Sequence, residues 1–188
     1  TRVIKSSVFK PRVIICVPSG VTEVEEMAVE EAAKNAGAKY VGLIEEPKAA
    51  AIGAGIDILK PNGNIVVDVG GGTTDIAVLS LGEVVLSDSI KVAGDKFDES
   101  IVKYIRREYN MLIGERTAEN IKQEIGCVYE QPEVSTMIIK GRCLLNGLPK
   151  SIEINSNEIM QPLQECAFSI VDALHGVLER TPPELVGD

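Results

Sequence analysis

The sequence lacks the features that would place it in a membrane, on a nucleic acid or around a zinc ion. No apolar run approaches the roughly 18 residues that a membrane-spanning helix requires. The four cysteines are scattered without a Cys-x-x-Cys pair, so we expect reduced thiols and neither a disulfide framework nor a zinc site. Acidic residues outnumber basic ones by 28 to 19, and the net charge of −9 argues against a nucleic-acid partner. We also expect no secretory signal segment.

The two most familiar glycine-rich phosphate loops are also missing. No Gly-x-x-x-x-Gly-Lys-Ser/Thr string occurs in the sequence, and no Gly-x-Gly-x-x-Gly opens a predicted helix. With 45% hydrophobic and 25% charged residues among 188, the composition is that of a globular protein with one large or two small domains.

The stretch Asp68-Val-Gly-Gly-Gly-Thr-Thr-Asp75 stands out instead. The runs 65–68 and 76–81 on either side are rich in β-branched residues and predict two strands, so the glycines form the turn between them. Glycine accepts positive φ and lets backbone come close to a ligand, and successive N–H groups in such a turn can bind an anion.

The residues around the glycine triplet favour phosphate and metal. Thr73 and Thr74 add hydroxyl donors, and Asp68 is placed to hold a hydrated magnesium ion. For a bare glycine triplet, a hairpin without a ligand is about as common as a hairpin that binds one. The aspartates on both sides of this triplet shift the balance toward a phosphate site.

Hydrophobic spacing and turn residues predict a mixed order of helices and strands. Thr22 and Glu25 form a capping box at the start of the first helix, and Asp95 and Thr117 are the expected N-caps of two later helices. Pro162 is expected to kink or split the last helix. The expected elements are strand 12–17, helix 22–37, strand 39–44, a helix from residue 47, strands 65–68, 76–81 and 84–92, a helix from residue 95, helix 117–126, strands 133–140 and 149–155, and helix 156–180.

This order predicts an α/β layer with a smaller lobe inserted. Residues 1–112 and 155–188 are predicted to form a large α/β subdomain, and residues 113–154 a small α+β subdomain.

Two adjacent glutamates, Glu45 and Glu46, precede the helix expected at Pro47. Because a helix N-terminus favours negative charge, helix stabilisation alone is the commoner explanation for such a pair. A catalytic role requires a phosphate nearby, which the glycine turn could supply.

The segment from Asp68 to Asp75 resembles the second phosphate-binding motif of the superfamily of actins, heat-shock chaperones and sugar kinases. Further stretches are similar to the MreB family of bacterial actins, which includes near paralogues such as Mbl. The resemblance extends through the whole chain and implies a ribonuclease-H-like, actin-like ATPase fold with a small α+β subdomain inserted. The stretches that carry it are Val17-Pro18, Leu43–Gly55, Ala93-Gly-Asp-Lys-Phe-Asp98, Ser156-Asn-Glu-Ile159 and Thr181-Pro-Pro-Glu-Leu185.

The resemblance implies roles for individual residues. Asp68 would hold Mg²⁺ through water, and Glu46 would activate the attacking water, with Glu45 as its rival. Thr74 and Asp75 would help to position that water. The implied ATP-binding residues are Gly70, Gly71, Gly72 and Thr73 at the β- and γ-phosphates, Gly94 and Asp95 beside the ribose, and Lys122 and Gln123 beside the adenine or ribose.

The resemblance also implies a function: an ATP-hydrolysing cytoskeletal protein that polymerises into filaments and controls rod cell shape and cell-wall synthesis. Its expected partners are further copies of itself and membrane proteins of cell-shape control and wall synthesis. Its expected place is the cytoplasm, at the inner face of the cell membrane. A chaperone or metabolite kinase of the same superfamily is the alternative.

Two motifs of the family are not found in the sequence: the first phosphate motif, Asp-x-Gly-Thr, and a glycine-triplet adenosine motif. We therefore expect a piece of a longer protein that carries the second of two domains and hydrolyses no ATP alone. In isolation it would be a binding and assembly module, with membrane contact made only by other parts.

Overall fold

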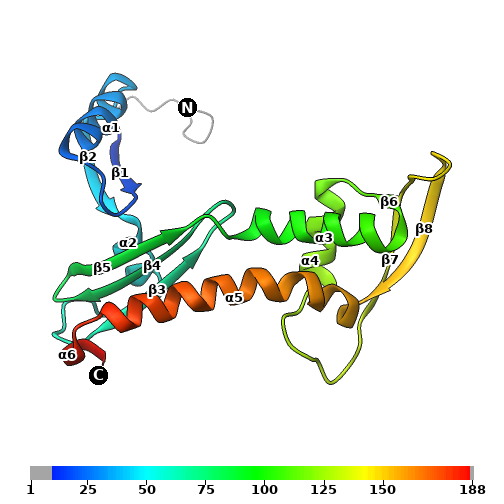
Figure 1. Ribbon diagram of the computed structural model, residues 1–188. Coiled ribbons are helices and arrows are strands. Elements are labelled where there is room, and N and C mark those ends of the chain that lie inside the picture. Colours follow the sequence, from blue (N-terminus) through cyan, green and yellow to red (C-terminus); the bar gives the residue numbers. More distant parts are fainter. Residues whose placement is uncertain (1–9, 187–188) are drawn as a thin grey trace. The chain divides into compact units, whose positions relative to one another are not determined.

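The computed structural model describes residues 10–186, and their contacts divide the chain into two compact units (Figure 1). The first unit contains the chain up to Asp68, the segment Ile76–Ser87 and the chain from Arg180 onward. The second unit contains Val69–Asp75 and Asp88–Glu179. Each unit has its own apolar core.

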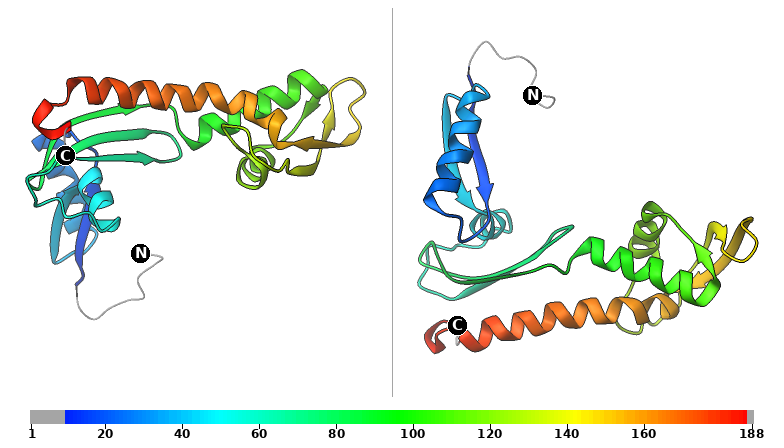
Figure 2. Two further views of the ribbon diagram at one scale, coloured as in Figure 1. Left: turned by 90° about the horizontal axis from the view of Figure 1, so that it is seen from below. Right: turned by 45° about the horizontal axis from the view of Figure 1, so that its top comes forward.

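The first unit begins with a strand–helix–strand segment. The strands β1 (Arg12–Val17) and β2 (Tyr40–Glu45) pair in parallel, and α1 (Glu23–Asn35) connects them and lies along them in both views of Figure 2. The predicted capping box is confirmed. The Thr22 hydroxyl accepts from the Glu25 N–H, and the Glu25 carboxylate accepts from the Thr22 N–H.

A three-stranded sheet and a short helix form the core of the first unit. The strands β3 (Asn64–Val69), β4 (Thr74–Ser80) and β5 (Glu83–Ile90) are neighbours in that order, which confirms the three predicted consecutive strands. The helix α2 (Glu46–Gly53) follows β2 directly and buries Ala51 in a core with Leu79. The small side chains of α2 allow this close packing.

The second unit packs two helices against a small antiparallel sheet. Ile101 and Ile105 from one helix, Ile121 from the other and Ile139 from the sheet are buried in one core. The pairing order of the sheet is β6-β7-β8. These elements are α3 (Gly94–Tyr109), β6 (Met111–Leu112), α4 (Glu115–Ile125), β7 (Thr136–Cys143) and β8 (Pro149–Asn155).

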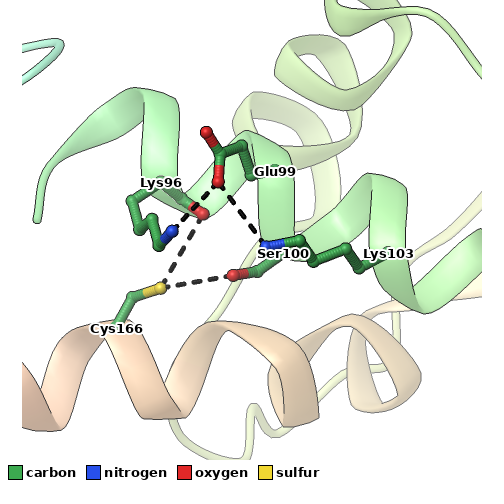
Figure 3. A network of polar contacts seen from close by, with 5 residues as sticks. All are labelled: Lys96, Glu99, Ser100, Lys103 and Cys166. Carbon is green, nitrogen blue, oxygen red and sulfur yellow. Dashed lines mark hydrogen bonds and ion pairs between the residues drawn. The ribbon is translucent and has the colours of Figure 1, made fainter.

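The helix α5 (Ser156–Arg180) continues from β8 and is not split at Pro162, while the kink that we expected as the other outcome stays a prediction. A proline inside a helix removes one N–H and crowds the carbonyl four residues earlier, but the buried side chains of Ile159 and Leu163 hold the helix on both sides of it. Figure 3 shows α5 beside α3, where the Cys166 thiol lies 3.4 Å from the Ser100 hydroxyl. A short helix, α6 (Pro183–Val186), follows. Within residues 10–186, no helix is long and apolar enough to cross a membrane.

Three boundary predictions are wrong. The N-cap of α3 is Ala93 instead of Asp95, because backbone carbonyls from another segment satisfy the first N–H groups of this helix. The helix α4 begins at Glu115, so Thr117 lies inside its first turn. The strand β7 begins at Thr136 instead of residue 133. The two-residue strand β6 is too short to produce a hydrophobic period and was not predicted.

The second unit is larger than the small subdomain that the sequence predicts at 113–154. It also includes α3 and most of α5, because both helices contribute to the core beneath the hairpin. The two units follow the packing of the chain and do not test the predicted subdomain boundaries, which stay a prediction.

Tyr109 ties α3 to α5 and carries a pH-dependent part of the stability. Its hydroxyl donates to the Glu158 carboxylate at 2.8 Å. Burial, and then this hydrogen bond, raise the pKa of Tyr109 to about 12. An unfolded tyrosine titrates near pH ~10, so deprotonation favours the unfolded chain. The stabilisation is complete below the unfolded pKa and is lost as the pH rises to the folded one.

We expect Tyr109→Phe to lower the free energy of unfolding by about 1 kcal/mol at pH 7, the typical net worth of such a hydrogen bond. The difference from the parent chain should shrink as the pH rises from about 10 toward 12. Urea unfolding across this range measures it. Tyr129→Phe, at a tyrosine 68% exposed, is the control. A constant difference at all pH values would contradict the assignment.

Candidate functional site

The glycine turn between β3 and β4 is bound to the start of α3. The N–H of Gly94 donates to the carbonyl of Gly70 at 3.1 Å, and the N–H of Asp95 donates to the carbonyl of Gly71 at 2.8 Å. The first N–H groups of a helix have no acceptor within the helix. The turn therefore caps α3, and no side chain caps this helix.

The turn leaves two amides available for an anion. The N–H of Gly70 donates to the Thr73 carbonyl at 2.9 Å and closes the turn. The N–H groups of Gly71 and Gly72 are exposed and have no partner among residues 10–186. Two consecutive free amides can form an anion-binding concavity, as the sequence predicts.

We expected glycine in this turn for two reasons, positive φ and close approach of backbone, and the first of them does not apply. Gly70, Gly71 and Gly72 do not adopt the left-handed conformation, so positive φ does not require them. A Cβ at Gly70 would lie 3.3 Å from the Thr73 carbonyl, and one at Gly94 would lie 3.3 Å from the Gly70 carbonyl. A side chain at Gly70 would crowd the turn itself, and one at Gly94 would crowd the approach of α3 to the turn, whereas Gly71 and Gly72 have no such close contact with backbone.

The three polar residues after the glycines have different environments. The Thr73 hydroxyl donates to the Asp75 carboxylate at 3.0 Å, and Thr73 is exposed. Thr74 is completely buried, and its hydroxyl donates to the Val92 carbonyl at 2.6 Å. Thr74 therefore helps to secure the strand, and its role in positioning water stays a prediction. Thr73 and Asp75 therefore place a hydroxyl and a carboxylate at the glycine turn.

A cavity of about 540 Å³ lies beside the turn, within the second unit. It has four acidic and two basic residues in its wall, so the wall is negative overall. The predicted residues Gly94, Asp95 and Lys122 line it, whereas Gln123 does not: its amide donates to Glu119 on the same helix at 3.4 Å. The lining residues are Gly70, Gly71, Gly94, Asp95, Asp98, Glu115, Arg116, Glu119 and Lys122.

Lys122 is held by two internal partners. Its amine donates to the Gly94 carbonyl at 3.1 Å and to the Asp98 carboxylate at 2.9 Å. Asp98 is a residue of this site that we did not predict from the sequence. Its position one helical turn after Gly94 was a signal that it faces the glycine turn. Its partner 24 residues away was not visible in the sequence.

A second cavity, of about 750 Å³, adjoins the first and shares Gly70, Gly94 and Lys122 with it. Its wall is mainly apolar, with the side chains of Phe97 and Leu163 among those that line it. The second unit thus has a polar cavity beside free amides and an apolar cavity next to it, a combination suited to a ligand with a charged and a flat apolar part.

Glu45 and Glu46 lie in the first unit, and their environments differ. Lys48 forms ion pairs with Glu83 at 2.7 Å and with Glu45 at 2.9 Å, and these hydrogen bonds, Glu83 first, raise the pKa of Lys48. Glu46 is the first residue of α2, and its side chain has no hydrogen-bond or ion-pair partner in the described part of the chain. Glu45 is thus engaged in holding α2, and Glu46 remains available. The predicted approach of Glu46 to the glycine turn stays a prediction.

Asp68 lies on β3, two residues before the turn, and its exposed carboxylate has no partner in the range 10–186. The same range contains no group of three or more metal-ligating side chains. Magnesium needs no such cage, since it is commonly held by one or two carboxylates, phosphate oxygens and water. A single free carboxylate is enough for that mode of binding, and the metal role of Asp68 stays a prediction.

A family model described as MreB/Mbl protein matches residues 1–188. The chain is 55% identical to the cell shape-determining protein Mbl of Bacillus cereus over 98% of its own length and 56% of that protein. It is 53% identical to the cell shape-determining protein MreB of Escherichia coli, over 95% of its own length and 51% of that protein. The chain thus spans about half the length of the curated relatives it matches.

Solved structures are similar to the chain as well. MreB5 of Spiroplasma citri bound to AMPPNP matches with a TM-score of 0.92 and 46% identity, over 100% of this chain and 56% of that one. The MamK double helical filament matches with a TM-score of 0.72 at 19% identity, over 98% of this chain and 55% of that one, a likeness of fold alone. Because a family model covers the whole chain and close relatives agree with it, the chain belongs to the MreB/Mbl protein family and has its actin-like α/β fold.

Proposed function

We propose that this chain supplies one wall of the ATP site in an actin-like cytoskeletal ATPase that controls cell shape. The observation that carries the proposal is the pair of free amides at Gly71 and Gly72 beside the polar cavity, in a chain of the MreB/Mbl family. Relatives named cell shape-determining and a neighbour bound to AMPPNP support it. Since the chain covers 56% of the Mbl relative, a complete site needs further parts.

The phosphates would bind at the glycine turn. The N–H groups of Gly71 and Gly72 would donate to phosphate oxygens, and the exposed Thr73 hydroxyl lies next to them in the chain. The base would enter the adjoining apolar cavity. Lys122 lies in the wall of both this cavity and the phosphate cavity. The rigid turn is preorganised for this task, because α3 already fixes its carbonyls.

A magnesium ion would accompany the nucleotide. The wall of the phosphate cavity contains four acidic side chains and two basic ones, and a bare polyphosphate would be repelled by it. Asp68 would hold the ion through water. When bound, the ion would neutralise charge on the transferring phosphoryl group. The protein would hold the ion in place through Asp68.

Hydrolysis needs a water that is oriented toward the terminal phosphate. We assign this role to Glu46, because Glu45 is committed to Lys48. Asp75, which accepts from Thr73, would help to orient the same water. Nucleotide binding would in turn favour head-to-tail assembly of copies into filaments, a type of contact that need not close into a ring. Membrane proteins of wall synthesis are the expected further partners, at the cytoplasmic face of the membrane.

The first test concerns Asp68. In the complete protein, we expect Asp68→Ala to weaken ATP binding in magnesium by about tenfold or more, the usual range when a metal site loses a supporting group. Binding in EDTA should be unchanged. Calorimetric titrations with and without magnesium measure both values. Asp57→Ala removes another exposed carboxylate of the first unit and is the control. Equal loss of affinity in both buffers would contradict a metal role.

The second test separates the two glutamates. We expect Glu46→Gln in the complete protein to lower kcat by about 100-fold or more, as the loss of a positioned base does, while ATP affinity stays close to that of the parent. Glu45→Gln should keep turnover but lower the melting temperature, because it breaks the ion pair with Lys48. Steady-state phosphate release measures the rates. A reversed pattern would transfer the role to Glu45.

The third test concerns the isolated chain. We expect residues 1–188 alone to release phosphate from ATP at the rate of their own Glu46→Gln variant, since a single wall cannot close around the nucleotide. A coupled phosphate assay over several hours measures this. A rate clearly above that of the variant would show that the chain is catalytically competent by itself.

A further inference from the structure

The contact between Asp98 and Lys122 has features that stability alone does not explain. Both side chains are largely buried, with exposed fractions of 16% and 26%, and their N–O distance is 2.9 Å. The other carboxylate oxygen of Asp98 is buried and has no hydrogen-bond partner among the described residues. An unsatisfied buried oxygen costs free energy, so a carboxylate at this position is not the most stable choice for packing.

The Lys122 amine stands where three parts of the site meet. It donates to the Gly94 carbonyl at 3.1 Å, and the N–H of Gly94 donates in turn to the Gly70 carbonyl. A continuous chain of polar contacts therefore runs from α4 through the first residue of α3 to the glycine turn. Lys122 also lines both cavities, so its position affects the wall that they share.

A lysine has several rotatable bonds and three donors, and it takes up a fixed position only where partners hold it. The carboxylate of Asp98 is the charged group that does so here. Without it, the amine would be drawn to the other acidic side chains of the same cavity, such as Asp95 and Glu119. Its bond to the Gly94 carbonyl would be lost, together with the tie between α4 and the turn.

We propose that Asp98 is a positioning residue of the nucleotide site, which holds the Lys122 amine against the Gly94 carbonyl and so fixes the wall between the phosphate and base cavities. Asp98 touches no nucleotide in this scheme and acts through Lys122. The inference rests on the proposed ATP site, although the tie between α4 and the turn can be measured without a ligand.

The test compares Asp98→Asn with Glu99→Gln in the complete protein. Both substitutions neutralise a carboxylate on α3 with little change in shape. Glu99 lies on the surface, where it pairs with Lys96 and Lys103 (Figure 3), and is 56% exposed. Any general effect of charge on this helix should therefore appear in both variants, whereas loss of the Lys122 contact appears only in Asp98→Asn.

The first readout is amide hydrogen exchange without nucleotide. We expect Asp98→Asn to speed exchange at Gly94 and Asp95 by about tenfold, because their tie to α4 is weakened, with amides of the core residues Ile105 and Ile121 unchanged. The second readout is ATP affinity in magnesium. We expect it to fall by about five- to tenfold, the size of the penalty for re-ordering one long side chain.

A double-mutant cycle with Lys122→Gln completes the design. We expect the affinity of Asp98→Asn/Lys122→Gln to equal that of Lys122→Gln alone, since the carboxylate acts only through the amine. The proposal is overturned if exchange at Gly94 and Asp95 matches that of Glu99→Gln, if ATP affinity stays within twofold of that control, or if the two losses add. If the parent protein binds no ATP, the proposed function fails, and the exchange data alone then decide whether Asp98 holds Lys122.

Discussion

The hydrogen bonds between the glycine turn and the first turn of α3 determine the candidate site. The carbonyls of Gly70 and Gly71 accept from the N–H groups of Gly94 and Asp95, which have no acceptor inside their own helix. The helix thus receives its cap from the turn, and the turn receives a fixed shape from the helix. A phosphate cannot use these helix amides, because they are occupied. The free amides at the tip of the turn are left for it.

Close backbone contacts explain two of these glycines. A side chain at Gly94 would press on the Gly70 carbonyl at 3.3 Å, and one at Gly70 would press on the Thr73 carbonyl at 3.3 Å, so the fold favours glycine at both positions whether or not a ligand binds. Gly72 differs, since a Cβ there would meet no atom within 4 Å. Its conformation does not require glycine either. What would require it is a group that approaches the open side of the turn, which is where a phosphate would lie.

The sequence predicts what is local and misses what depends on distant partners. The β-branched runs around the glycine triplet and the capping box at Thr22 are local signals, and both predictions are confirmed. The N-cap of α3 was wrong because its donors pair with a turn more than 20 residues earlier. Asp98 was missed for the same reason. The choice between Glu45 and Glu46 depends on Lys48, whose second partner is Glu83 on β5.

The pairing of Lys122 with Asp98 would also affect the charge that a nucleotide meets in the proposed site. With this lysine paired internally, Arg116 is the basic residue left in the wall of the polar cavity, which it shares with Asp95, Glu115 and Glu119. In a partly water-filled cavity, charges a few ångströms apart still interact by a few kcal/mol at an effective dielectric constant of about 20. A bare triphosphate would therefore be disfavoured relative to its magnesium complex. In the proposed site, the acidity of the wall would thus favour the metal-bound nucleotide, in addition to the carboxylate that would hold the metal.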